Sequence, residues 1–196
     1  MHCYGCNSTT PKRFLSLGHQ PPSDAFLSKK QLREPEETYP LDVYFCPDCT
    51  LVQLGHAVDP AILFREYVYT SGSNSNLRVS LASLAEKLVT RSNLGAKDLV
   101  IDIGSNDGTL LSAFREYGVR LLGVDPSSVG KAANKACIPT VHDFFTAEVA
   151  KKIVRSHGKT RLIVSTNAFA HVHELQSYLK GVRTLLTPDG IFVTES

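Results

Sequence analysis

The feature that most constrains this chain is a buried-strand pattern that runs directly into a glycine turn. The run is Leu99-Val-Ile-Asp-Ile-Gly-Ser-Asn-Asp-Gly-Thr109, and a second strand pattern further on, Leu121-Leu-Gly-Val-Asp125, ends in an acid. In open α/β sheets such a turn passes under an adenosine-bearing cofactor, and the acid binds the ribose hydroxyls. The pattern therefore predicts a cofactor site. An ordinary turn that needs positive φ at one glycine is the alternative.

The composition of the turn indicates which cofactor it binds. Dinucleotide sites use G-x-G-x-x-G, whose second glycine lets the backbone approach a pyrophosphate. Here Asn106 stands at that second position, and no glycine stands at the third. This favours a ligand without a diphosphate, with S-adenosylmethionine (SAM) as the leading candidate, and disfavours a nicotinamide cofactor.

Residues at the ends of the predicted strands are the candidate cofactor ligands. Asp102 is expected to accept a hydrogen bond from the SAM amino group, and Asp125 to bind the ribose diol, unless it only caps the helix ahead of Pro126. After the third strand, Asp143 and Phe144 are expected at the adenine, although core packing explains Phe144 or its neighbour equally well. The remaining candidates shape the turn, begin its helix or follow the fourth strand: Gly104, Asn106, Asp107, Gly108 and Asn167.

Four cysteines occur as two pairs with the same spacing, Cys3-Tyr-Gly-Cys6 and Cys46-Pro-Asp-Cys49. Two residues between thiols allow both sulfurs of a tight turn to face one metal ion, and two such turns complete a tetrahedral shell. We predict a structural Zn²⁺ site, with an iron–sulfur centre or no metal as alternatives. A closed shell leaves no open position for catalysis. The fifth cysteine, Cys137, is expected to be a small core residue.

The rest of the chain alternates strands and helices. We expect strands at 99–103, 120–124, 138–141, 161–165 and 190–194. We expect helices at 75–92, 107–117, 127–136, 146–156 and 174–186. This rhythm predicts an α/β fold with a parallel, Rossmann-like sheet of about five strands, preceded by a small zinc-binding β module. The predicted domains are the module at 1–57, a linker at 58–74 and a SAM-binding domain at 75–196.

Charge and hydropathy exclude some classes of function. The formal net charge is +2 and basic residues form no run, so nucleic acid is not an expected partner. No apolar run approaches the roughly 18 residues of a membrane span, and the N-terminus lacks the pattern of a signal peptide. We therefore expect a cytoplasmic protein without a membrane partner.

Several short motifs, taken in order, resemble one family. Besides the cysteine pairs and the glycine turn, they are Gly18-His-Gln-Pro-Pro-Ser-Asp-Ala-Phe26, Tyr39-Pro-Leu41, Cys49-Thr-Leu-Val-Gln-Leu54, Tyr67-Val-Tyr-Thr-Ser-Gly-Ser73, Val124-Asp-Pro126 and Asn167-Ala-Phe-Ala-His171. The chain resembles the SAM-dependent sugar C-methyltransferases, which carry a zinc-binding module ahead of a class I methyltransferase domain. The resemblance implies a nucleotide-linked 4-keto-deoxysugar as substrate, deprotonated beside its ketone so that the enolate attacks the methyl group.

The resemblance also implies catalytic residues. It places a substrate-contacting histidine at His171, for which a solvated or capping role at the start of a helix is the alternative. Tyr67 and Tyr69 are expected to reach the sugar or its 4-oxygen as phenol donors, unless they only pack at an interface. An imidazole with a pKa near 6.5 can accept or donate the proton.

The sequence departs from the family pattern at its C-terminal side. The family's Tyr-x-Glu-His run and second domain are absent, and five strands are predicted where class I sheets have seven. We expect a truncated chain, or one whose missing part comes from a partner domain or from self-association. The alternative function is a non-catalytic scaffold or assembly protein that binds SAM and zinc.

Overall fold

The computed structural model describes residues 1–23, 25–135 and 137–195, which form two compact units. Unit 1 comprises Met1–Glu66 with His173–Gln176, and unit 2 comprises Tyr67–Val172 with Ser177–Ser196. The division after Glu66 falls inside the segment predicted to be a linker. Parts of three predictions lie outside the described residues: position 24 of the 18–26 motif, the end of the 127–136 helix and the last residue of the 75–196 domain.

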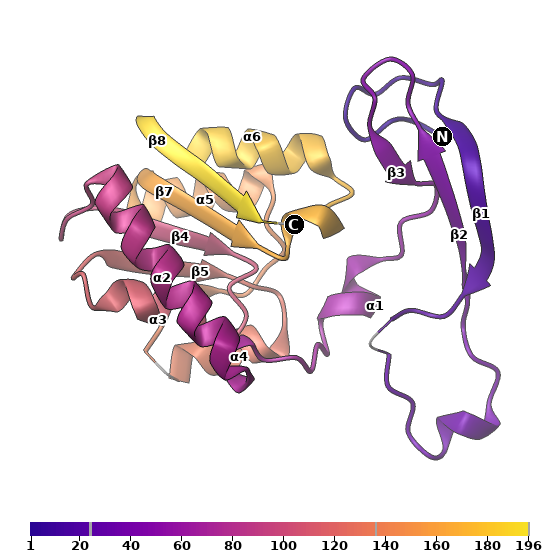
Figure 1. Ribbon diagram of the computed structural model, residues 1–196, viewed down its shortest axis with the longest axis horizontal. Coiled ribbons are helices and arrows are strands. Elements are labelled where there is room, and N and C mark those ends of the chain that lie inside the picture. Colours follow the sequence, from indigo (N-terminus) through magenta and orange to yellow (C-terminus); the bar gives the residue numbers. More distant parts are fainter. Residues whose placement is uncertain (24, 136, 196) are drawn as a thin grey trace. The chain divides into compact units, whose positions relative to one another are not determined.

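Unit 1 is built on a small antiparallel sheet of order β1-β2-β3 (Figure 1). Its strands are β1 (Lys12–Gln20), β2 (Tyr39–Phe45) and β3 (Val52–Leu54), with a 3₁₀ turn at Gln31–Arg33. Helix α1 (Pro60–Phe64) begins after Asp59, whose carboxylate accepts a hydrogen bond from the Ala61 amide at 2.8 Å.

This sheet has little apolar core. Every residue of β1 is exposed, including Phe14 with 61% of its surface accessible. The buried apolar residues described in this unit are two of the paired cysteines, Cys3 and Cys46. Apolar packing therefore contributes little to holding unit 1 together.

Unit 2 contains a parallel sheet of order β6-β5-β4-β7-β8, with five strands among the described residues. The strands are β4 (Leu99–Ile103), β5 (Arg120–Val124), β6 (Thr140–Val141), β7 (Thr160–Thr166) and β8 (Leu186–Glu195). The predicted parallel sheet is therefore confirmed. Three strands differ in length from the prediction: β6 is shorter, β7 is one residue longer at each end, and β8 begins at Leu186, four residues before position 190. The pairing of β7 with β8 has an irregular register between Thr160 and Leu162.

Helices follow the strands of unit 2 in alternation. They are α2 (Ser75–Ser92), α3 (Thr109–Arg115), α4 (Ser128–Lys135), α5 (Ala147–His157) and α6 (Leu175–Leu185), with 3₁₀ turns η2 (Ser71–Ser73) and η3 (Phe169–His171). The helix predicted to begin at 107 begins at Thr109, because Asp107 and the left-handed Gly108 belong to the turn.

The helices cover the sheet on both faces, as Figure 1 shows. Val100 of β4 packs in a cluster with apolar residues of α2 and α3, whereas Ile101 and Ile103 pack in a second cluster with residues of α5 and α6. Successive side chains of a strand point to opposite faces, so the apolar residues of β4, which only Asp102 interrupts, serve both clusters. The fold is a three-layer α/β sandwich.

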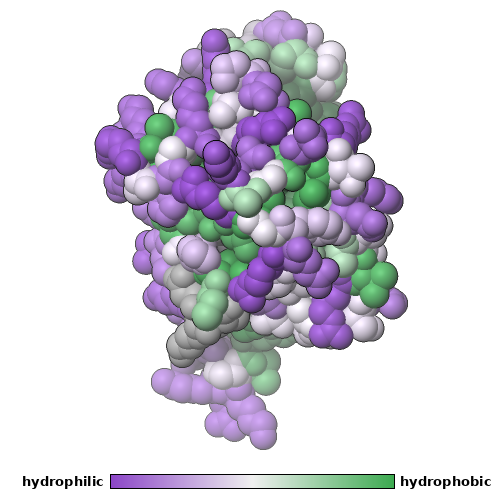
Figure 2. All heavy atoms as spheres, turned by 90° about the vertical axis from the view of Figure 1, so that its left-hand side faces the viewer, coloured by the Kyte–Doolittle hydropathy of each residue, from purple (hydrophilic) through white to green (hydrophobic). Residues whose placement is uncertain are grey.

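The strand order indicates where an open α/β sheet of this kind commonly binds a ligand. From β4 the chain proceeds outward to β5 and β6, and then returns to add β7 and β8 on the other side of β4. Open α/β sheets bind ligands beside the carboxyl ends of the strands where this order reverses, here between β4 and β7. Figure 2 shows the other end of this sheet, where the strand arrows of Figure 1 begin. Hydrophilic side chains dominate this face, with apolar patches between them.

One prediction about the core is wrong. Cys137 is exposed and has a left-handed backbone with φ of 61°. It lies in a turn ahead of β6, and the neighbouring Ile138 fills the core position instead, with none of its surface accessible.

Candidate functional site

The predicted glycine loop, residues 104–108, forms a tight turn at the carboxyl end of β4. Gly104, Asn106 and Gly108 all have left-handed backbones, with φ of 81°, 51° and 79°. The Gly104 amide donates to the Val124 carbonyl at 2.8 Å, so the loop is bonded to the end of β5. These conformations suit glycine and asparagine, which explains the residue types at these positions.

Gly104 is also required because another loop approaches it closely. A Cβ atom at Gly104 would lie 2.5 Å from the Cβ atom of Ala168, in the loop that follows β7. The loops after β4 and β7 therefore touch at the point where the strand order reverses, and together they form one end of the predicted crevice.

Asp125 lies at the end of β5 and joins the glycine loop to the start of α4. One carboxylate oxygen, Oδ2, accepts from the Asn106 amide at 2.8 Å. The other, Oδ1, accepts from the Ser127 amide at 2.9 Å and from the Ser127 hydroxyl. The side chain is buried, and it holds Ser127, whose hydroxyl oxygen accepts from the Gly130 amide in the first turn of α4 at 3.1 Å; the direct cap of this helix is therefore Ser127, which Asp125 supports. Oδ2 has one partner and keeps a second lone pair that can accept from a ribose hydroxyl, whereas Oδ1 already accepts two hydrogen bonds.

Asp102 is a buried carboxyl group at the same edge, with 2% of its surface accessible. Its Oδ1 atom has no hydrogen-bond partner among the described residues. Burial, together with the nearby charge of Asp125, raises the pKa of Asp102 to about 7. A buried carboxylate without partners is costly, so this group is suited to bind a cation or a hydrogen-bond donor.

Asn106 and Asp107 bind a neighbouring segment of backbone. The Asn106 side chain accepts from the Ser71 amide at 2.9 Å and donates to the Tyr69 carbonyl at 3.0 Å. Oδ2 of Asp107 accepts from the Gly72 amide at 2.8 Å. Both residues were predicted as cofactor ligands, and their side chains hold residues 69–73 against the loop.

The candidates that were predicted to follow the third and fourth strands of this sheet lie after β6 and β7; only the two after β6 were predicted to lie at the adenine. Asp143 is exposed just after β6, and its Oδ1 accepts from the Phe144 amide at 2.9 Å; Phe144 is half-buried. Asn167 follows β7 with a left-handed φ of 53°, and its amide donates to the Glu195 carbonyl at 2.9 Å. Core packing was the alternative role for Phe144 or its neighbour. It fits Phe145, whose ring centroid lies 5.0 Å from that of the buried Tyr178.

The predicted catalytic residues lie on two segments of unit 2. His171 is exposed at the end of η3, just after β7. Tyr67 and Tyr69 lie beside each other in an edge-to-face arrangement, with ring centroids 6.5 Å apart. The Tyr69 carbonyl contacts the glycine loop through Asn106.

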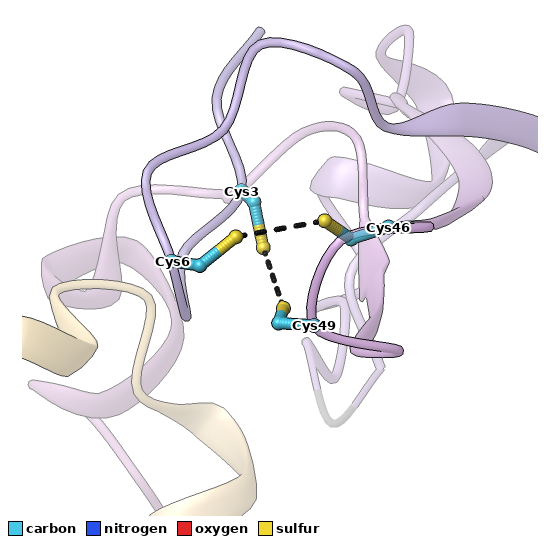
Figure 3. Close-up of side chains that lie close together, drawn as sticks. All are labelled: Cys3, Cys6, Cys46 and Cys49. Carbon is cyan, nitrogen blue, oxygen red and sulfur yellow. Dashed lines mark hydrogen bonds between the residues drawn. The ribbon is translucent and has the colours of Figure 1, made fainter.

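The paired cysteines come together in unit 1, as Figure 3 shows. The four Sγ atoms lie within 4.8 Å of one another, with Cys3 3.5 Å from Cys49 and Cys6 3.6 Å from Cys46. Four thiols from two Cys-x-x-Cys turns at this separation fit the tetrahedral shell of a zinc ion.

By itself, the cluster favours a thiolate at one position: the pKa of Cys3 is lowered, whereas the pKa values of Cys6 and Cys49 are raised. Burial raises the pKa of the Cys3 thiol, but amides of Cys6 and Gly5 and the thiol of Cys49 outweigh it, and the pKa falls to about 7. Thiolates are the form that binds a metal. The set of four thiols and their separation fit Zn²⁺, and Cys3, Cys6, Cys46 and Cys49 are the residues that would hold it.

Sequence reasoning missed residues that act through backbone contacts. Gln53 is the buried residue of β3; its Oε1 accepts from the Tyr4 amide at 2.9 Å, and its Nε2 donates to the His2 carbonyl at 3.2 Å. Ser127 supports Asp125, and Ser71 and Gly72 bind the glycine loop. Ser71 and Gly72 lie within the 67–73 motif, which gave them no role of this kind, and no such role was predicted for Gln53 or Ser127.

Across the described residues, no helix is both long and apolar enough to cross a membrane.

Comparisons with known proteins match both units. Residues 3–64 match a family model described as "Putative zinc binding domain", and residues 74–196 match one described as "Methyltransferase domain". The solved structure of PH0226 protein from Pyrococcus horikoshii is similar in fold, with a TM-score of 0.52 and 20% identity over 64% of this chain and 57% of that one.

A curated relative is similar over nearly the whole chain. C-methyltransferase NovU from Streptomyces niveus is 34% identical over 98% of this chain, which spans 46% of that protein's length. The class I methyltransferase-like sheet, the four-cysteine cluster and these matches agree with one another. The chain therefore belongs to the methyltransferase-domain family, and residues 3–64, ahead of that domain, are similar to the family described as "Putative zinc binding domain".

Proposed function

We propose that unit 2 binds SAM in the crevice at the carboxyl ends of β4, β5 and β7 and transfers its methyl group to carbon. The observation that carries this proposal is Asp102, a buried carboxyl with a partnerless oxygen beside a left-handed glycine loop, in a chain of the methyltransferase-domain family. SAM carries an ammonium and a sulfonium, and an anionic group at this edge stabilises such a ligand.

The residues at the crevice have distinct roles in this proposal. Oδ1 of Asp102 accepts from the amino group, and the backbone of Gly104 and Gly108 leaves room for the methionine end. Asp125 accepts from the ribose hydroxyls while it continues to hold the loop. Asp143, Phe144 and Asn167 line the adenine side, where an aromatic face and a carboxylate suit a purine with an exocyclic amine.

The acceptor we propose is a nucleotide-linked 4-keto-deoxysugar. The similarity to a protein named C-methyltransferase supports transfer to carbon, and a carbon beside a ketone is the acidic position that such a reaction needs. His171 takes the proton from that carbon at a ring nitrogen, and the phenol of Tyr67 or Tyr69 donates to the 4-oxygen as the enolate forms. Bound SAM supplies an electrophilic methyl group.

The zinc ion in unit 1 is structural in this proposal. Its four cysteine ligands leave no open coordination position, and the sheet around it has little apolar core. Reduced thiols also favour the cytoplasm as the compartment. A C-terminal partner domain or a second copy of the chain completes the acceptor site.

Calorimetry and labelled SAM test the proposal in two steps. Titration with S-adenosylhomocysteine (SAH) should release or absorb heat with the purified chain, and a chain that is folded yet silent contradicts the cofactor site. Methyl transfer from labelled SAM to one of a panel of 4-keto sugar nucleotides supports the enzyme. SAH binding without transfer to any acceptor, even with the C-terminal part of a relative added, favours the scaffold alternative.

A further inference from the structure

The segment that enters unit 2, residues 69–73, is fastened to the glycine loop by side chains of that loop. We call this segment the strap. Its bonds use both ends of the Asn106 amide: the oxygen accepts from Ser71 and the nitrogen donates to the Tyr69 carbonyl. One side chain thereby binds the strap backbone as a neighbouring strand would.

Asp107 adds a second fastening next to the first. Its Oδ2 accepts from the Gly72 amide at 2.8 Å, and its Oδ1 accepts from the Thr109 amide at 3.1 Å and hydroxyl at 2.6 Å. The fit is close, because a Cβ atom at Gly72 would lie 2.8 Å from Asp107 Oδ2 and 2.9 Å from Thr109 Oγ1. A side chain at position 72 would therefore have to displace the Asp107 carboxylate and the Thr109 hydroxyl from these positions.

These contacts explain why the turn departs from the dinucleotide pattern. A glycine in place of Asn106 would adopt the same φ of 51°, but it would lose both bonds to the strap. An aspartate would keep the acceptor for Ser71 and lose the donor for Tyr69. Asparagine is the residue that tolerates the left-handed backbone and provides donor and acceptor together.

We propose that Asn106 and Asp107 are positioning residues that couple the strap to the cofactor. The backbone of residues 104–108 shapes the cofactor site, and side chains of the same residues bind the strap. Binding of the cofactor and attachment of the strap therefore depend on one conformation of this loop. This inference rests on the proposed function, because it takes the methyl donor as the ligand of the loop. When the methyl donor binds and fixes the loop, it stabilises the hydrogen bonds between the loop and the strap. These hydrogen bonds in turn favour binding of the methyl donor.

Amide hydrogen exchange measured by NMR tests the fastening without any ligand. Asn106→Gly should accelerate exchange of the Ser71 amide by at least about tenfold, with the amides of β4 unchanged as an internal reference. Asn106→Asp is the matched control, since its carboxylate still accepts from Ser71 and should keep that amide slow. Asp107→Ala should accelerate the Gly72 amide. An unchanged Ser71 rate in Asn106→Gly, with the chain folded, overturns the strap.

Addition of SAH tests the coupling. In the unaltered chain, saturating SAH should slow exchange of the Ser71 and Gly72 amides by some factor. Asn106→Gly should then bind SAH more weakly by up to the same factor, because coupling between two binding equilibria is reciprocal. SAH that binds and slows neither amide overturns the coupling. SAH that fails to bind the unaltered chain overturns the proposed function instead, and the ligand-free rates still decide the strap.

Discussion

At the scale of single residues, Asp102 has opposite consequences for stability and for binding. Its carboxyl is buried, one oxygen has no partner among the described residues, and its pKa is raised from 3.8 to about 7. Between those values the folded chain holds a proton that the unfolded chain has lost. The unfolding free energy therefore falls as the pH rises through this window, and the cost is fully present above pH 7.

Asp102→Asn should remove this cost. The neutral variant should be more stable than the unaltered chain at pH 8, by at most about 4 kcal/mol, and the gain should largely vanish near pH 4. It should also bind SAH at least about tenfold more weakly, because a neutral amide replaces a carboxylate facing an ammonium. Urea unfolding at the two pH values and calorimetry measure both effects. An equal stability difference at both pH values would contradict this account of Asp102.

At the scale of elements, the order and type of the strands and helices in unit 2 were predictable. Apolar runs such as β4 and the helical spacing of apolar residues in α2 are local signals, and the sheet could be inferred from their alternation. The start of β8 was missed because Pro188 and Gly190 are typical of a turn, whereas here they lie within a strand that has an irregular register.

The contacts between elements were much less predictable. The positions of Asp102, Gly104 and Asp125 followed from where strands end. The bonds from Asn106 and Asp107 to the strap did not, because they join side chains to backbone groups far apart in the sequence and leave no periodic pattern. Gln53 was missed for the same reason: its partners are backbone atoms of Tyr4 and His2.

The loops after β4 and β7 should be energetically coupled through Gly104. Gly104→Ala should destabilise the chain by about 1–3 kcal/mol, because it adds a Cβ both at a left-handed φ and against Ala168. Ala168→Gly removes the steric part of this cost, so the double variant should be more stable than the sum of the single effects predicts, by about 0.5 kcal/mol or more. Urea unfolding measures these changes in the free energy of unfolding. If the changes in the two single variants add up to the change in the double variant, the two loops do not meet as described.

Gln53 should help to retain the metal in unit 1. Gln53→Leu leaves the Tyr4 amide and the His2 carbonyl without their hydrogen-bond partner. A buried group left in this way costs about 1–3 kcal/mol of folding free energy. Transfer of zinc to a colorimetric chelator should therefore be at least about fivefold faster than for the unaltered chain. Val52→Thr, on the exposed side of β3, is the control and should release zinc at the original rate. Equal rates for both variants would contradict the role of Gln53.

At the scale of the whole molecule, the two units differ in what stabilises them. Unit 2 has two apolar clusters on either side of its sheet, whereas the described sheet of unit 1 is mostly exposed around its four cysteines. Removal of zinc with a chelator should therefore unfold unit 1 and leave unit 2 folded.

Hydrogen exchange with mass spectrometry distinguishes the units after chelation. Peptides from residues 1–66 should lose protection, while peptides from β4, β5 and β7 should keep it. Cys46→Ser should reproduce the effect without a chelator. Protection that persists in residues 1–66 after zinc is removed would contradict a structural role for the metal.

The most direct test of the cofactor site is a crystal structure of the chain with SAH. The account predicts electron density between the carboxyl ends of β4 and β7, with the amino group in hydrogen-bond contact with Asp102 and the ribose in contact with Asp125. A crevice that stays empty under saturating SAH, or SAH bound away from residues 102–108 and 125, would contradict it.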